Sequence, residues 1–351
     1  MAYTTIDDPS AYFQTALYTG NGGTLAVTND GNSDLQPDFV WTKGRSDSDN
    51  NSLFDSSRGT TKEINTNGTG AEGTTSGVTA FSSDGFTLGS NSGINGNTET
   101  YVAWQWKANG GTATASQSEG GTNLACSAQA NTTAGFSVVT YTGSGTSGHG
   151  FLHGLGVAPN FVAVKNRSTS RDWACYHTGT SSAAHALFLN GTSAQDNSAD
   201  YFPADATSTL VKVGNRNESN EDGDSFVAYC FTEIQGYSKF GSYTGNGNAD
   251  GPFVYTGFKP AWIMQKNTAD TTNWNIHDNK RSTFNTVDDI LMANANDAEG
   301  AVGGKSIDFL SNGFKLRGND NETNDNTDVH VYMAFAEHPF VSSKGVPTTA
   351  R

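Results

Sequence analysis

The sequence is short of apolar residues and contains no long apolar run. Hydrophobic residues account for 34% of its 351 positions. A helix that crosses a bilayer needs about 20 consecutive apolar residues, and the longest apolar stretches of this chain are far shorter. We therefore expect no insertion into a membrane.

Basic residues are also scarce. The chain has 20 Lys and Arg against 35 Asp and Glu, which gives a formal net charge of −15 at pH 7. Proteins that bind nucleic acid neutralise phosphates with clustered Lys and Arg side chains. We therefore expect no nucleic-acid partner.

Cysteine is rare, and its spacing matches no metal-binding motif. Cys126, Cys175 and Cys230 are the three cysteines, and they form no C-x-x-C pair. An odd number without metal spacing favours free thiols and assembly in a reducing cytoplasm. No disulfide framework is expected.

Glycine and aromatic residues are abundant. The chain has 41 Gly, 20 Phe, 12 Tyr and 6 Trp. Disordered chains are poor in aromatics, whereas short strands joined by glycine turns use both residue types. This composition favours an ordered all-β protein.

One stretch of seven residues is written three times. Each copy reads Pro, any residue, aromatic, β-branched, two variable residues and Lys. The copies are residues 37–43 (PDFVWTK), 159–165 (PNFVAVK) and 260–266 (PAWIMQK). Proline fits the start of a strand, and offsets of 122 and 101 residues, from 159 − 37 and 260 − 159, are typical of domain-sized repeats.

Two further motifs recur around each copy. A strand ending in Tyr and followed by a glycine turn precedes it, at residues 18–22 (YTGNG), 141–145 (YTGSG) and 243–247 (YTGNG). A closing strand follows it, at residues 101–104 (YVAW), 226–229 (FVAY) and 332–335 (YMAF). Several short strands with turns between them in about 100 residues are typical of a β-sandwich.

The predicted fold is therefore all-β, with three internal repeats that form tandem antiparallel β-sandwich modules of jelly-roll-like type. The expected parts are module 1 (residues 1–108), a linker rich in Gly, Ser, Thr and Asn (109–134), module 2 (135–236), module 3 (237–340) and a tail (341–351). Residues 287–294 are the one segment for which we expect a short helix.

These motifs carry a resemblance to a known family. Together with residues 1–20, 154–159 (GLGVAP), 236–245 (GYSKFGSYTG) and 309–316 (FLSNGFKL), they make the chain similar to an uncharacterised repeat domain. That domain is common in predicted tail and virion proteins of marine tailed bacteriophages. The resemblance covers nearly the whole chain and implies a virion component, and it transfers no active site.

Sequence patterns typical of catalysis are missing. No G-x-S-x-G motif, which marks the nucleophile of many hydrolases, is present. Lys43, Lys165 and Lys266 close the three Pro-led stretches, and this threefold use favours a structural role against an acidic neighbour. We expect the protein not to be an enzyme.

Two acid–base pairs also recur at a spacing of three residues. Asp55 with Arg58 and Asp278 with Arg281 occupy corresponding places in modules 1 and 3. The spacing favours local ion pairs over the separated carboxylates that glycan hydrolysis needs.

The polar loops that precede the closing strands of modules 2 and 3 are candidate calcium sites. Ca²⁺ takes six to eight oxygen ligands, and these loops offer many, although neither follows EF-hand spacing. The alternative is a solvated turn, because Asn and Asp favour turns. The candidate ligands are Asp222, Asp224, Asp320, Asp325 and Asp328, and no other cofactor is expected.

Two tryptophans are candidates for receptor binding. The six tryptophans mostly fall at corresponding strand positions, which favours a place in the core. Trp106 and Trp173 are the least constrained by the repeat. A surface Trp can stack on a sugar ring, so these two would form the receptor site.

The predicted function is that of a bacteriophage virion structural protein, in a tail or tail-fibre appendage that contributes to host-surface attachment. A capsid-surface decoration or head-fibre protein is the alternative, and an envelope-polysaccharide hydrolase is a third. The expected partners are further copies of the chain in a homo-oligomer, a trimer by family analogy, other virion proteins and host-surface glycans. The expected location is the virion, assembled in the host bacterial cytoplasm.

Overall fold

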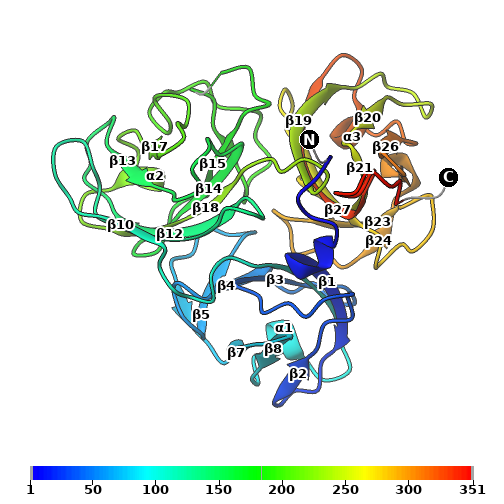
Figure 1. The fold of residues 1–351 in the computed structure, drawn as a ribbon, viewed down its shortest axis with the longest axis horizontal. Helices are drawn as coiled ribbons and strands as arrows, with labels where there is room; N and C mark the ends of the chain where they lie inside the picture. The colour runs from blue at the N-terminus through cyan, green and yellow to red at the C-terminus, as the bar shows by residue number, and fades with distance from the viewer. Residues whose placement is uncertain (1–2, 183, 349–351) are drawn as a thin grey trace.

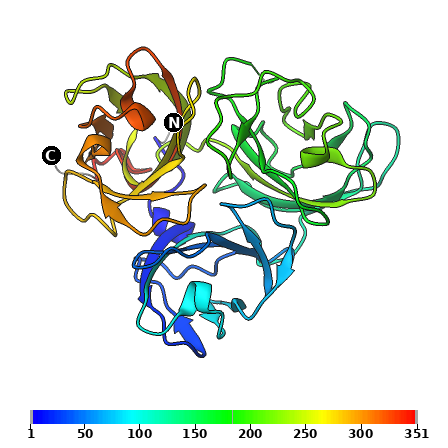
Figure 2. The same ribbon diagram turned by 180° about the vertical axis from the view of Figure 1, so that it is seen from behind.

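The chain folds into three β-rich lobes that meet around a common centre. The computed structural model describes residues 3–182 and 184–348. Figures 1 and 2 show module 1 in blue to cyan, module 2 in green and module 3 in yellow to red. The predicted all-β class with antiparallel sheets is confirmed.

Module 1 combines a large and a small sheet. The large sheet has the order β1-β9-β3-β4-β5-β6 and the small sheet the order β2-β8-β7. Its elements are η1 (Pro9–Ala11), β1 (Phe13–Thr19), β2 (Leu25–Val27), β3 (Phe39–Gly44), β4 (Ser52–Asp55), β5 (Lys62–Asn65), β6 (Gly73–Thr74), β7 (Val78–Ser82), β8 (Gly85–Leu88), α1 (Ser92–Asn95) and β9 (Thr100–Trp106).

Module 2 has the same plan with two added strands at one edge. Its large sheet has the order β10-β11-β12-β18-β14-β15-β16, and β13 pairs with β17. The elements are β10 (Ala115–Gln117), β11 (Cys126–Asn131), β12 (Phe136–Thr142), β13 (Gly150–Leu152), β14 (Phe161–Asn166), β15 (Ala174–His177), β16 (Leu187–Phe188), β17 (Leu210–Lys212), α2 (Asn217–Asn220) and β18 (Ser225–Phe231).

Module 3 repeats the plan again. Its large sheet has the order β19-β27-β21-β22-β23-β24 and its small sheet the order β20-β26-β25. The elements are β19 (Ser238–Thr244), β20 (Phe253–Tyr255), β21 (Phe258–Asn267), β22 (Asn275–Asp278), β23 (Asp289–Met292), β24 (Gly300–Ala301), η2 (Gly303–Lys305), β25 (Ile307–Leu310), β26 (Gly313–Leu316), α3 (Asn321–Asn324) and β27 (Val329–Pro339).

The strand registers define equivalent positions in the three modules. In each large sheet the first strand pairs with the last, and the last pairs with the Pro-led strand. The equivalent cross-strand pairs are Thr15 with Trp104, Val138 with Tyr229 and Phe240 with Met333. By this register, the predicted match between residues 332–335 and residues 101–104 is wrong by two positions.

Each large sheet is buried on both faces. One face packs against the other modules in a shared central core, which includes Trp104, Tyr229 and Trp262. The other face packs against the same module's small sheet and loops, in a separate cluster for each module. The central strands β3 and β14 are consequently buried at every position, as expected for a sheet covered on both sides.

Three segments differ from the sequence-based expectations. Residues 109–134 are not a loose linker, because β10 and β11 lie there and β11 pairs with β12 along six residues. Residues 287–294 contain the strand β23 where we expected a helix, since Ile276 and Asn275 of β22 offer it a pairing edge. The expected tail is partly ordered, because Ser343 N donates a hydrogen bond to Asp7 Oδ1 at 2.6 Å, and residues 349–351 lie outside the described part.

Candidate functional site

Each module contacts a neighbour through the residue immediately before β4, β15 or β22. These residues, Asn51, Trp173 and Trp274, are at most 2% exposed. Each side chain donates a hydrogen bond to a main-chain carbonyl of another module. The pairs are Asn51 Nδ2 with Met292 O (2.8 Å), Trp173 Nε1 with Asn65 O (2.9 Å) and Trp274 Nε1 with Phe188 O (2.9 Å). These contacts lead from module 1 to 3, from 3 to 2 and from 2 to 1, so they close a ring.

A second ring involves the last residues of the same three strands. Asp55, His177 and Asp278 are at most 1% exposed. The pairs are Tyr229 Oη donating to Asp55 Oδ2 (2.6 Å), Trp104 Nε1 donating to Asp278 Oδ2 (3.0 Å) and His177 Nε2 with Tyr332 O (3.0 Å). Gly179 N–H donates to His177 Nδ1 at 2.8 Å, so His177 Nε2 carries the proton and donates.

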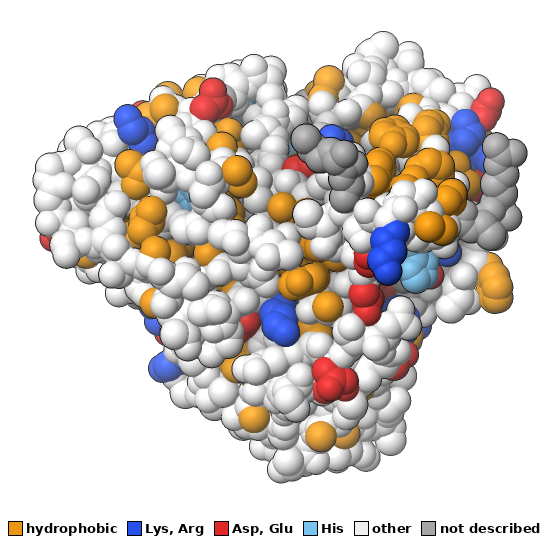
Figure 3. Space-filling view, in the orientation of Figure 1, with side chains coloured by type: hydrophobic (Ala, Val, Ile, Leu, Met, Phe, Trp, Pro, Cys, Tyr) orange, Lys and Arg blue, Asp and Glu red, His pale blue; other side chains and the backbone are white. Residues whose placement is uncertain are grey.

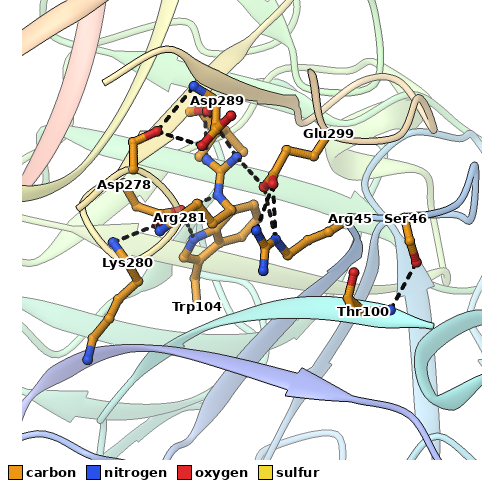
Figure 4. Close-up of polar contacts among 11 residues, drawn as sticks. Arg45, Ser46, Thr100, Trp104, Asp278, Lys280, Arg281, Asp289 and Glu299 are labelled. Carbon is orange, nitrogen blue, oxygen red and sulfur yellow. Dashed lines mark hydrogen bonds and ion pairs between the residues drawn. The ribbon is translucent and has the colours of Figure 1, made fainter. Parts of the chain in front are cut away.

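Buried ion pairs reinforce two of the three interfaces. Arg281 contacts Asp278 at 2.6 Å and Glu299 at 3.1 Å, and Glu299 also receives three hydrogen bonds from Arg45 of module 1 (Figure 4). The expected Asp278–Arg281 ion pair is thus confirmed, and it forms part of an inter-module network. Arg281 also lies 5.9 Å from the centre of the Trp104 ring.

The equivalent network joins modules 1 and 2. Arg58 pairs with Asp55, which confirms the other expected ion pair, and it contacts Glu72 at 3.1 Å. Glu72 in turn receives two hydrogen bonds from Arg167 of module 2, at 2.8 and 3.0 Å. Burial by itself would lower the pKa of Arg58, but the neighbouring Asp55 carboxylate outweighs it and raises that pKa.

The three recurring lysines are buried, and their hydrogen bonds go to oxygens other than carboxylates. Lys165 Nζ donates to Thr69 O at 2.7 Å and Lys266 Nζ donates to Thr272 Oγ1 at 2.9 Å, whereas Lys43 Nζ lies 3.5 Å from Asp49 O. Burial lowers the pKa of each lysine to about 8. The structural role of these lysines agrees with the sequence-based expectation. The expectation that each lysine binds an acidic neighbour is wrong, because carbonyl and hydroxyl oxygens accept the hydrogen bonds.

The polar loops before the closing strands are held by an equivalent buried asparagine in each module. Asn95, Asn220 and Asn324 end the short helices α1, α2 and α3 and are fully buried. Each side chain donates hydrogen bonds to two carbonyl oxygens, which for Asn324 are Asn248 O (2.8 Å) and Gly318 O (2.9 Å). We did not predict a role for these asparagines from the sequence. Their signal is a fixed spacing, because all three stand five residues before the first residue of the closing strand.

The five candidate calcium ligands contact other groups of the protein in this structure. Asp224 accepts hydrogen bonds from Asn166 and Thr169, and Asp328 accepts one from Asn267. Asp320 caps α3 by accepting from Glu322 N. Asp325 accepts a hydrogen bond from Asn326 N, while Asp222 lies beside Gly145.

Across residues 3–182 and 184–348, a single group of three potential metal ligands has its ligand atoms within 4.8 Å of one another. It consists of Asp47, Asp49 and Glu99 of module 1 and includes none of the five candidates. The Glu99 carboxylate accepts a hydrogen bond from Tyr101 Oη at 2.6 Å. Burial, with Glu99 and Asp47 nearby, raises the pKa of Asp49.

Trp106 and Trp173 do not lie on the surface. Trp106 is 1% exposed and Trp173 is 0% exposed, and both belong to the shared central core. Trp106 packs against Phe13, Trp262 and Phe335. Neither ring can stack on a glycan in this structure, because the inner faces of the sheets cover both.

Residues from all three modules surround a small void at the centre. Its lining is apolar, and Trp106, Trp173 and Trp262 form part of it. Its volume is about 30 Å³, close to the volume of one water molecule in the liquid. The void is therefore a packing feature and has no room for an organic ligand.

A larger cleft opens to solvent between modules 1 and 3. We call it the interface cleft, and define it by Asp8, Thr15 and Asp30 of module 1 with Asn279, Lys280 and Glu337 of module 3. Its volume is about 250 Å³. Charged and histidine side chains gather on this face near the boundary between the two lobes (Figure 3).

The fold and its interfaces define a class of protein: an all-β chain whose three modules form one interlocked unit. The chain belongs to the family described as a domain of unknown function (DUF7483), whose model matches residues 8–339. The family unit therefore spans all three modules and the cleft between the first and the third. No match was found among the curated proteins or the solved structures. Within the described residues, no helix combines the length and the apolar character needed to cross a membrane.

Proposed function

We propose that the chain is a structural component of a bacteriophage particle, part of the tail or a tail-fibre appendage that contributes to host-surface attachment. The observation that carries this proposal is the closed ring of inter-module contacts. Buried polar side chains that recur at equivalent positions, such as Trp173 and Trp274, bind the modules to one another. The phage context comes from the resemblance of the repeated motifs.

The disposition of the charged residues supports a mechanical role. Arg58 and Arg281 are fully buried and paired with carboxylates on both sides. Removing one partner of a buried pair is strongly destabilising, so these residues stabilise one arrangement of the modules. A rigid unit of this kind suits a particle component, which must keep its shape during assembly and adsorption.

Immunogold labelling of intact particles tests the proposal. Antibody raised against the purified chain should label the tail or its appendages. Labelling of the capsid surface would favour a decoration or head-fibre protein, and particles without label would contradict both assignments.

Size-exclusion chromatography with light scattering tests the proposed self-association, for which we expect the mass of a trimer.

An assay on host polysaccharide tests the non-catalytic part of the proposal. Purified protein incubated with envelope polysaccharide should release no reducing ends above a heat-denatured control. Release that depends on intact protein would replace the structural role with that of a hydrolase.

A further inference from the structure

The three module interfaces follow one plan, and one of the positions at which they differ lies on the strands β1, β12 and β19 of the large sheets. Val138 and Phe240 fill this position at the interfaces of modules 1 and 2 and of modules 2 and 3, and both are at most 4% exposed. The equivalent residue at the interface of modules 1 and 3 is Thr15, by register with the closing strand. A threonine is polar and smaller than phenylalanine, and the interface cleft lies beside it.

The opposite wall of the same interface lacks a contact that is present at the interface of modules 1 and 2. At the interface of modules 1 and 2, the Gln129 side chain donates hydrogen bonds to Ser56 Oγ and Ser57 Oγ, both at 2.7 Å. The residues equivalent to these serines in module 3 are Asn279 and Lys280, which likewise follow the aspartate that ends the strand. Within the described residues, the Asn279 side chain has no hydrogen-bond partner and lines the cleft.

A buried hydroxyl group in the cleft is also unpaired. Thr15 is 4% exposed, and its Oγ1 has no hydrogen-bond partner in the described part of the chain. A buried polar group without a partner costs free energy. Because this atom is buried, a ligand group would relieve this cost only if the Thr15 side chain rotated into the cleft.

The charged groups of the cleft are paired within the protein. Asp30 contacts Lys280 at 2.8 Å and Glu337 contacts Lys259 at 2.6 Å. Asp8 accepts hydrogen bonds from Ser10 and Ser33; burial by itself would raise the pKa of Asp8, but these hydrogen bonds outweigh it and lower that pKa. Within the described residues, the lining groups without a hydrogen-bond partner include Thr15 Oγ1 and the amides of Asn32 and Asn279, which are uncharged, and His338 Nε2 lies 4.0 Å from Glu337. The cleft is therefore not built for a free ion.

We propose that the interface cleft binds one ring of a neutral saccharide. Phe13, Ala261 and Ala336 supply apolar lining for the C–H face of the ring, and the uncharged amides of Asn32 and Asn279, which line the same cleft, hydrogen-bond its hydroxyls. A volume of about 250 Å³ lies just below the range of drug-sized ligand pockets, about 300–1,000 Å³, and so suits a ligand no larger than one ring. The inference rests on the proposed attachment role for its biological meaning and identifies the class of ligand.

Saturation-transfer difference NMR on the full chain tests this inference. The probes are the methyl glycosides of glucose, galactose and N-acetylglucosamine, with acetate and tetramethylammonium as charged comparison probes. We expect transfer to at least one glycoside and none to the two ions. Transfer to neither class, or to an ion alone, would overturn the inference.

Two variants and a matched control locate the binding. Thr15→Phe places in the cleft the residue that fills the equivalent position in module 3, and it should abolish transfer while a thermal melt shows a folded chain. Asn279→Ala, on the cleft surface, should weaken binding about fivefold to tenfold through the lost hydrogen bond. Asn97→Ala changes an exposed asparagine in the polar loop of module 1 and should leave binding unchanged.

Binding that survives both cleft variants would place the saccharide elsewhere and refute the inference. This outcome is separate from the fate of the proposed function. Gold labelling reports the place of the chain on the particle, whereas the NMR titration reports only the cleft.

Discussion

Single buried residues determine how the modules fit together, and the paired arginines show this most directly. The side chains of Arg281 and Asp278 are both 0% exposed, whereas those of the adjacent Lys280 and its partner Asp30 are 39% and 70% exposed. A buried charge cannot be left without its partner, while an exposed pair exchanges its contact for water at little cost. Two neighbouring cations in one turn should therefore differ greatly in their effect on stability.

We predict that Arg281→Ala lowers the free energy of unfolding by about 3–5 kcal/mol, because it leaves Asp278 buried and unpaired. Lys280→Ala, the matched control, should change it by less than about 1 kcal/mol. Urea denaturation followed by tryptophan fluorescence measures both values. Equal effects of the two changes would contradict the role assigned to Arg281.

The buried histidines predict a dependence of stability on pH. Burial lowers the pKa of His177, His277 and His330 to about 4, whereas the pKa in the unfolded chain is about 6.5. Between these values the unfolded state binds protons that the folded state does not, so the free energy of unfolding decreases as the pH falls.

We expect a loss of up to about 1.4 kcal/mol per pH unit for each of the three histidines between pH 6.5 and 5. Urea titrations at these two pH values measure the slope. His177→Gln should be less stable at pH 7 but should show a shallower slope. A free energy of unfolding that is constant across this range would contradict the prediction.

At the scale of elements, the sequence predicts strands and turns well because their signals are local. The alternation within residues 37–43 and the glycine turns appear as expected around β3, β14 and β21. The closing strand of module 3 was misaligned by two residues, and alternation cannot detect such an offset because side chains two apart lie on the same face. The register between strands reveals it, for example through the pairing of Tyr243 with His330.

Two sequence-based predictions were wrong because the residues that decide them are far apart in the chain. The composition of residues 109–134 indicates a linker, but the free edge of β12 recruits β11. Trp106 and Trp173 lie in the core because three sheets turn their inner faces toward one centre. No pattern within one module indicates that arrangement.

The polar loops form defined elements, and a buried asparagine is the reason. Asn324 Oδ1 accepts a hydrogen bond from Asn246 N at 2.9 Å, in addition to the two that its amide donates. A carboxylate at this position would face two carbonyl oxygens without water. The amide therefore has a role that an aspartate cannot take.

We predict that Asn324→Asp lowers the free energy of unfolding by about 3 kcal/mol, because a buried charge loses both donated hydrogen bonds. Asn326→Asp introduces the same charge two residues away at an exposed position and serves as the control, with an expected change below about 0.5 kcal/mol. Thermal melts of the two variants at pH 7 compare them. A control as unstable as Asn324→Asp would point to general charge repulsion.

At the scale of the whole molecule, the shared core makes the modules depend on one another. Trp104 of module 1, Tyr229 of module 2 and Trp262 of module 3 belong to one cluster. Separating the modules would expose the inner faces of all three large sheets. Apolar surface contributes about 25 cal/mol per Å² when buried, so isolated modules should be much less stable.

We predict one cooperative unfolding transition for the full chain in differential scanning calorimetry. The fragment of residues 109–236, which keeps β10 and β11 of its own sheet, should bind a hydrophobic dye, because its inner sheet face has lost its cover. Resolved transitions for separate modules, or a compact fragment that binds no dye, would contradict this prediction.

The sequence thus predicts the modules, and the structure reveals the interfaces and the cleft between them. Thr15 has no distinctive neighbours along the chain, and its place opposite Asn279 depends on the closure of the ring. The buried ion pairs were recognisable from their recurrence, whereas their partners Glu72 and Glu299 were not. Contacts between residues far apart in the chain require the assembled fold.

In a single polypeptide with three similar lobes, the three boundaries can differ in sequence. In an association of identical subunits they cannot. In a homotrimer, one codon change alters every subunit, so a cleft next to threonine would appear at all three boundaries or at none. Here the boundaries between modules 1 and 2 and between modules 2 and 3 keep valine and phenylalanine at this position, while the remaining one carries threonine. Duplication within one gene allows two boundaries to preserve the scaffold while the third diverges.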